Sequence, residues 1–309
     1  MRHVLEPGPG TVVDAFSRDA TPVLTVDAGD TVAVRTLDAH GNLERLTGPG
    51  VQGRVLIAGS RGHTLCGPVA VRGARPGTAL SVTVRSLRPD SWGWTVAGRD
   101  TPLNRRLGVA DDGGHRTLWE LDADTMVGTS DLGFAVDLRP FLGVVGLAPA
   151  EPGDHSTIPP RREGGNIDCK ELVAGSTLYL PVAVDGALLS VGDGHAAQGD
   201  GEVSGTAIEC GMTTELVLDV EQSPMLPTAY ATTPAGRVTF GFDVSLDEAA
   251  AAALDAMLTW LQGDLALARA AVLSLASVAV DLRVTQMANQ VWGVHAVLPH
   301  GALRRAAGA

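Results

Sequence analysis

The chain has 309 residues, of which 45% are hydrophobic, and this is enough for a large ordered core. Its formal net charge of −12 argues against a nucleic-acid partner and against an anionic membrane surface. The three cysteines form no C-x-x-C pair, so we expect no disulfide framework and a cytoplasmic protein.

Short runs rich in Val and Thr, separated by Gly and Pro, dominate the first 90 residues. We predict strands over 23–27, 31–37, 69–72 and 79–87. In the last of these, Leu80, Val82 and Val84 alternate with polar residues, which is the period of a half-buried strand. Residues 90–135 are less regular and are predicted as long loops. The predicted strands of the first 90 residues therefore indicate a β-sandwich or a barrel-like layer.

Strands are predicted to return over 136–220, with Pro181 placing the strand at 177–184 at a sheet edge or a bulge. Helices are predicted only late in the chain. Ser245 begins a capping-box pattern, and an apolar stripe follows it up to a break at Gly263. A second helix is predicted over 265–277. The apolar segment 265–280 is too short to span a membrane, and we expect it to belong to the core.

These patterns predict a mainly β fold, built from β-sandwich or barrel-like subdomains, with a smaller α/β portion that contains the two late helices. We expect a β-rich N-terminal subdomain over 1–135. A catalytic subdomain, also β-rich and ending in the helices and further strands, is expected over 136–309.

One run carries most of the functional information, because an apolar strand at 187–191 opens into a glycine-punctuated loop of polar residues. The polar residues of the run are Asp193, His195, Gln198, Asp200 and Glu202. Glycines at 192, 194, 199, 201 and 205 are expected to allow positive φ, so that these side chains converge. Carboxylates and an imidazole beside buried strands are typical of a metal site or a water-activating site. The alternative is that the carboxylates only cap turns.

Two further segments supply candidates. Asn166 and Asp168 follow two glycines and would share one face of an extended chain. His63 precedes a strand and could act as a third metal ligand, since metal sites collect ligands from several segments, although a turn residue is the plainer interpretation.

Four blocks of sequence, in order along the chain, resemble the acetamidase/formamidase family. The blocks are the ranges 63–77, 141–149 and 277–283, together with a long central block that combines 161–168, 172–182 and 192–203. The resemblance implies a mostly β fold, hydrolysis of short amides, a divalent metal and a homo-oligomer. All the candidate residues named above fall on family motif positions.

The resulting hypothesis is a metal-assisted amidase that acts on a small amide. Asp193, His195 and His63 would hold the metal, zinc in the first instance and calcium as an alternative. Asn166 and Gln198 would bind the substrate, and Glu202, Asp200 and Asp168 would be the catalytic carboxylates. Two alternatives stay open: a non-catalytic metal-binding scaffold, and a hydrolase of a different amide or of a urea.

Overall fold

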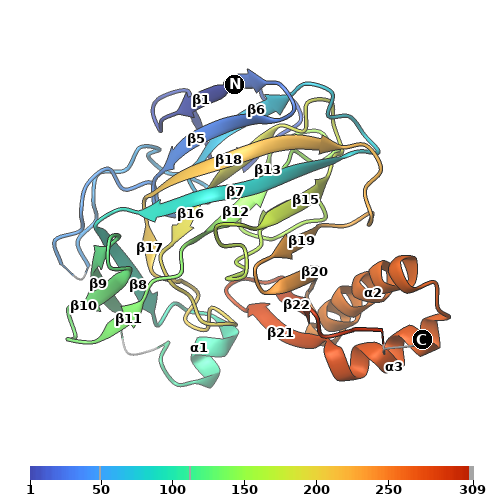
Figure 1. Ribbon diagram of the computed structural model, residues 1–309. Helices are drawn as coiled ribbons and strands as arrows, with labels where there is room; N and C mark the ends of the chain where they lie inside the picture. Colours follow the sequence, from blue (N-terminus) through green and yellow to red (C-terminus); the bar gives the residue numbers. More distant parts are fainter. Residues whose placement is uncertain (49, 111–112, 306–309) are drawn as a thin grey trace.

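The computed structural model describes residues 1–48, 50–110 and 113–305, and strands dominate it (Figure 1). Within these residues, one sheet has nine strands. Their order is β1 (Arg2–Leu5), β5 (Asp30–Thr36), β18 (Met212–Glu221), β7 (Ala79–Pro89), β15 (Thr177–Pro181), β19 (Tyr230–Thr233), β20 (Gly236–Asp243), β22 (Trp292–Pro299) and β21 (Asp281–Gln286). The mainly β prediction is confirmed.

A second sheet has eleven strands in the described part of the chain. Eight of them follow the order β11 (Ala135–Asp137), β10 (Val127–Ser130), β9 (His115–Asp122), β8 (Trp92–Ala97), β17 (Glu209–Cys210), β16 (Leu189–His195), β12 (Phe141–Gly146) and β14 (Gly164–Asn166). The other three are β6 (Leu65–Val71), which pairs with β16, and β2 (Val12–Val13) and β4 (Leu24–Val26), which pair with β6. A small two-stranded sheet joins β3 (Ala15–Phe16) to β13 (His155–Ser156).

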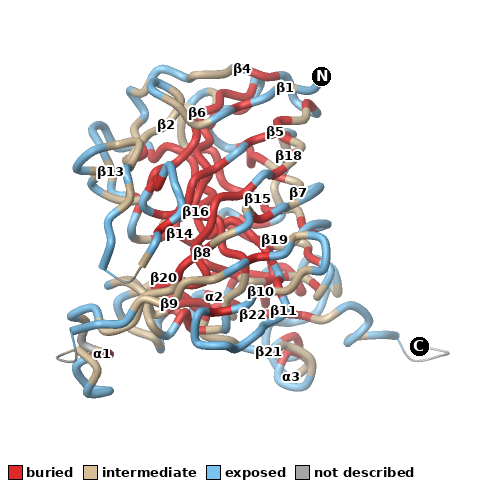
Figure 2. The backbone as a smooth tube through the Cα atoms, turned by 90° about the vertical axis from the view of Figure 1, so that its left-hand side faces the viewer, coloured by how far each residue is buried: buried red, intermediate tan, exposed pale blue. Residues whose placement is uncertain are grey.

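The main core lies between the two large sheets. Its largest buried cluster combines Leu80 and Leu218 of the nine-stranded sheet with Leu142 and Val191 of the eleven-stranded sheet. Figure 2 shows this buried backbone running through the middle of the molecule. Strand pairs cross the expected boundary after residue 135 in both sheets, since β7 pairs with β18 and β8 with β17. Each large sheet therefore contains strands from both sides of this boundary, and the division into two subdomains stays a prediction.

The three helices of the described residues are α1 (Pro102–Arg106), α2 (Leu246–Leu265) and α3 (Arg269–Ala279). The predicted cap is present, because the Ser245 side chain accepts a hydrogen bond from the backbone N–H of Glu248. α2 packs against β20 and β22 (Figure 1). The approach is close: a Cβ on Gly241 of β20 would lie 2.0 Å from the carbonyl oxygen of Ala249.

Several local predictions are wrong. The range predicted as loops contains β8, in which Trp94 is fully buried. β15 lies inside the sheet between β7 and β19, and Pro181 is tolerated because β19 pairs only up to Tyr179. Gly263 does not end α2, which continues for two residues to Leu265.

The apolar segment assigned to the core is largely a surface helix. In α3 only Val272 and Ala276 are buried, whereas Leu273 and Val278 are 45% and 82% exposed. Full burial within α3 is confined to the i, i+4 pair Val272 and Ala276, which faces α2 and β22, and Ala279 packs against the same cluster while partly exposed. Among the described residues, no single helix is long and apolar enough to cross a membrane, and the bent pair of α2 and α3 passes that test only together.

Candidate metal centre and active site

The register of the eleven-stranded sheet brings three polar side chains together. Asp193 and His195 are two residues apart on β16, so they share one face of the strand. On one side, His195 is paired with Glu209 of β17, and on the other with Phe141 of β12. The Phe141 ring meets the imidazole edge-on, with 5.1 Å between ring centroids. The cluster is therefore built on strands rather than on the loop that the sequence indicates.

The expectation of positive φ holds for Gly201 and Gly205, at 96° and 88°, and fails for the other glycines of this run. Gly192 and Gly194 do not adopt positive φ; they lie in β16, where a Cβ would come within 2.8 Å of Leu65 and 2.6 Å of the Cys210 carbonyl oxygen. Three carboxylate residues also have positive φ values: 53° at Asp168, 58° at Asp193 and 44° at Glu202. Such values in residues other than glycine are strained and typical of functional sites.

Four buried carboxyl groups surround the imidazole of His195. Its Nε2 lies 3.3 Å from Asp193 Oδ2 and 3.4 Å from Glu209 Oε1, and its Nδ1 lies 4.0 Å from Asp168 Oδ1. The ligand atoms of Asp168, Asp193 and His195 all lie within 4.8 Å of one another, and so do those of His195, Glu202 and Glu209. Each of these five side chains keeps at least one fully buried polar atom without a hydrogen-bond partner. Buried atoms of that kind are typical of a site that binds a cation.

The pKa values of the buried carboxyl groups also indicate a site for a cation or for protons. Burial raises the pKa values of Glu202 and Glu209 to about 8. Burial, followed by the neighbouring Glu202, raises the pKa of Asp168 well above its usual range. At Asp193 burial also acts to raise the pKa, but His195 and His63 outweigh it and hold the pKa below its usual range. The protein alone cannot keep all four groups ionised, so either protons or a cation must occupy the centre.

Gln198 fixes the tautomer of His195. Its Nε2 donates a 2.7 Å hydrogen bond to the backbone carbonyl oxygen of Asp168, which can only accept. Its Oε1 therefore faces His195 Nδ1 at 2.8 Å and accepts the proton that Nδ1 carries. The Nε2 lone pair of a neutral His195 then faces two carboxylate oxygens, a repulsive arrangement unless a proton or a metal ion lies between them. Both ends of its amide bond to the protein, so Gln198 orients His195, and the role in substrate binding stays a prediction.

His63 and Asn166 complete the wall of the site. His63 Nε2 lies 3.9 Å from Asp193 Oδ2, and its backbone N–H and Nδ1 both contact Thr157 Oγ1. Asn166 Nδ2 donates to the carbonyl oxygen of Ile158 at 3.1 Å, while Asn166 Oδ1 is buried without a partner. An unused acceptor of this kind can receive an N–H group of a substrate.

The two carboxylates of the 199–205 loop diverge. Gly201 bonds to the backbone of Thr285 and Met287 near the end of β21, and Glu202, buried beside it, faces the cluster. Asp200 instead forms a 2.9 Å ion pair with Lys170, with 30% of its side chain exposed. The structure thus brings together every candidate carboxylate except Asp200, and it adds Glu209, which the sequence analysis left out.

A cavity of about 300 Å³ opens onto this cluster. Its lining includes His63, Asn166, Asp193, Glu202 and Glu209. This volume is at the lower end of the range usual for small-molecule sites. The donors fit a divalent cation, because an imidazole lone pair and several carboxylate oxygens with no other partner point to one place. The imidazole favours a transition metal or zinc over calcium, which prefers oxygen ligands throughout.

A model of the acetamidase/formamidase family matches residues 10–153 and 150–235. The chain belongs to this family. An acetamidase of Mycolicibacterium smegmatis is 29% identical over 230 residues, which cover 56% of this chain and 57% of that protein. The chain thus matches little more than half the length of that relative.

Solved structures of the family have the same fold. An acetamidase of Bacillus halodurans is 29% identical with a TM-score of 0.86, over 96% of this chain and 97% of the other. An acetamidase of Yersinia enterocolitica is 25% identical with a TM-score of 0.86, over 99% and 94%.

Proposed function

We propose that this chain hydrolyses short aliphatic amides of the formamide and acetamide type to a carboxylate and ammonia. The observation that carries the proposal is the set of four buried carboxyl groups around one imidazole, three of which (Asp193, Glu202 and Glu209) line a small-molecule cavity. The names of its family relatives, acetamidase and formamidase, support the same chemistry. The acidic net charge fits a neutral substrate.

A divalent metal, zinc as the first candidate, is the cofactor that we propose. His195 Nε2 and Asp193 would hold it, with Asp168 and His63 beside them. Once bound, such a cation polarises a carbonyl group and makes water a better nucleophile at neutral pH. It would also neutralise part of the negative charge that four carboxylates concentrate at this point.

The side chains of the site supply the remaining steps. Asn166 Oδ1 accepts a hydrogen bond from the amide nitrogen of the substrate and orients it. Glu202 takes a proton from the attacking water as the new C–O bond forms. The same carboxyl group then protonates the nitrogen as the C–N bond breaks, so that ammonia can leave. A pKa of about 8 suits a group that exchanges protons near neutrality.

Two matched variants test this role, because the 199–205 loop has one carboxylate in the site and one outside it. Glu202→Gln should fold and bind metal but lose ~10²–10⁴-fold in ammonia release from formamide and acetamide. Asp200→Asn, which only breaks the surface pair with Lys170, should stay within about threefold of wild type. Equal activity in both variants would reject Glu202 as the proton carrier. Bound metal without ammonia from any amide or urea would favour a scaffold.

A homo-oligomer stays a prediction, and α3 supplies the surface that we propose for it. Leu273 and Val278 on this helix, and Leu282 at the start of β21, are 45%, 82% and 47% exposed. Large apolar side chains exposed to this extent are candidates for an interface between copies of a chain. Light scattering should give a multiple of the mass of one chain, and Val278→Glu should shift it towards the monomer.

A further inference from the structure

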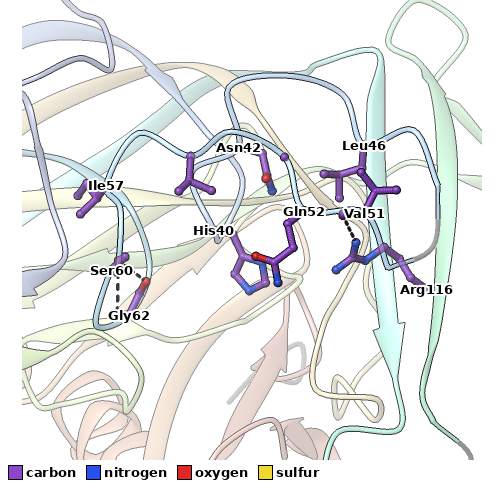
Figure 3. Close-up of a pocket in the computed structure, with 12 residues that line it drawn as sticks. His40, Asn42, Leu46, Val51, Gln52, Ile57, Ser60, Gly62 and Arg116 are labelled. Carbon is purple, nitrogen blue, oxygen red and sulfur yellow. Dashed lines mark hydrogen bonds between the residues drawn. The ribbon is translucent and has the colours of Figure 1, made fainter.

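A second cavity, of about 290 Å³, adjoins the site cavity beneath the segment that connects β5 to β6 (Figure 3). His40, Ser60 and Gly62 line both cavities, so the two share a wall. The volume is some twentyfold larger than the ~10–15 Å³ that a single water molecule needs. Acetamide would leave most of the combined space unfilled.

The walls of this cavity are fixed by hydrogen bonds. The buried carboxylate of Asp38 accepts three of them, from the backbone and side chain of Asn42 and from Trp94 Nε1, at 2.7–2.9 Å. Across the segment, the backbone N–H of Leu56 donates to the carbonyl oxygen of Gly41 at 2.9 Å. The guanidinium of Arg116 donates to the carbonyl oxygen of Val51 at 2.7 Å (Figure 3). These hydrogen bonds hold the walls of the cavity in place in the folded protein.

The lining is amphipathic. Leu46, Val51, Val55 and Ile57 give it an apolar side. The polar side consists of His40, Asn42, Gln52 and Arg116. Mixed linings of this kind hold organic groups by contact with their carbon atoms and orient them with a few hydrogen bonds.

We propose that this second cavity receives the acyl chain of the substrate, so that amides with longer acyl chains than acetamide are also substrates and are preferred. The inference rests on the proposed amide hydrolysis and extends its substrate class beyond formamide and acetamide. With the amide at Asn166 and Glu202, the acyl group extends past His40, which borders both cavities, towards Ile57. Each methylene that an enzyme buries in an apolar pocket adds about 1–3 kcal/mol of discrimination, or ~10–200-fold.

A matched pair of Ile→Phe variants tests the inference, because one isoleucine lines each cavity. Ile57 lines only the second cavity and Ile158 only the site cavity. Ammonia release should be measured from formamide, acetamide, butanamide and hexanamide. In wild type, kcat/KM should be ~10-fold or more higher for hexanamide than for acetamide. Ile57→Phe should lower the hexanamide to acetamide ratio by ~10-fold or more, whereas Ile158→Phe should lower both values together.

The other outcomes distinguish failure of the inference from failure of the proposed amide hydrolysis. A wild-type kcat/KM that falls from acetamide to hexanamide, or an unchanged ratio in Ile57→Phe, overturns the inference but leaves amide hydrolysis intact. No ammonia from any amide overturns the proposed function, and calorimetry with hexanamide then decides the inference. If wild type binds hexanamide and Ile57→Phe does not, the inference is supported. If wild type does not bind hexanamide, the inference is rejected. If Ile57→Phe does not fold, Ile57→Ala should lower the ratio by removing apolar contact with the acyl chain, and an unchanged or raised ratio rejects the inference.

Discussion

Replacing Gln198 by Met should weaken metal binding without touching any metal ligand. Met has nearly the same length but removes the two short hydrogen bonds of the amide, the one from His195 Nδ1 at 2.8 Å and the one to the Asp168 carbonyl oxygen at 2.7 Å, together with a long one of 3.5 Å to the Thr285 carbonyl oxygen. At ~1 kcal/mol net for each short bond, the total is ~2 kcal/mol. Tenfold in affinity corresponds to about 1.4 kcal/mol, so Zn²⁺ should bind ~30-fold more weakly. This lies within the ~10–100-fold usual when the group that orients a ligand is removed.

The assay is competition for Zn²⁺ between the metal-free protein and a chromophoric chelator, together with urea unfolding to confirm the fold. Gln262→Met is the matched control, since Gln262 only accepts a bond from Arg269 between α2 and α3. The control should leave the affinity for Zn²⁺ unchanged. If Gln198→Met binds Zn²⁺ as tightly as wild type, Gln198 does not set the tautomer of His195, and the argument for a metal-facing Nε2 fails.

Three further predictions concern glycine positions and a buried histidine. A Cβ on Gly143 would lie 2.6 Å from Asp193 Oδ2 and 2.7 Å from Asp168 Oδ1. Gly143→Ala should therefore abolish Zn²⁺ binding in the chelator assay. Gly199→Ala is the control and should leave Zn²⁺ binding intact, because the space around Gly199 is open. Gly263→Ala, inside α2 with only one distant neighbour, should raise the free energy of unfolding by ~0.5–1 kcal/mol in urea titrations. Burial lowers the pKa of His295 from 6.5 to about 4, so the unfolded state binds the extra proton and stability falls as the pH drops through that window, by up to ~3 kcal/mol. His295→Asn should flatten that dependence, and an unchanged slope would contradict the assignment.

The sequence predicted the β-rich fold and the two late helices because both depend on local periodicity. The alternation in β7 and the N-cap at Ser245 are local signals, and both are confirmed. It could not predict which face of α3 is buried. That choice depends on α2 and β22, and most of the apolar residues of α3 face away from them.

Within the site, prediction succeeded where side chains lie on the same strand and failed where strand pairing decides. Asp193 and His195 are close because residues two apart share a face of β16. Glu209 joins them only because β17 pairs with β16 in one register, which the sequence does not specify. A charged residue directly after the apolar stretch 206–208 was the one local signal for it.

The divergence of Asp200 and Glu202 shows a second limit. Two residues apart, they would share a face of an extended chain, yet Gly201 and Glu202 both have positive φ, at 96° and 44°, and the chain turns between them. The hydrogen bonds of Gly201 to Thr285 and Met287 hold that turn against the end of β21. Burial of Glu202 thus depends on a hairpin more than eighty residues downstream. A mutation that loosens β21 should therefore displace Glu202, the proposed proton carrier, while leaving Asp193 and His195, which lie on β16, in place.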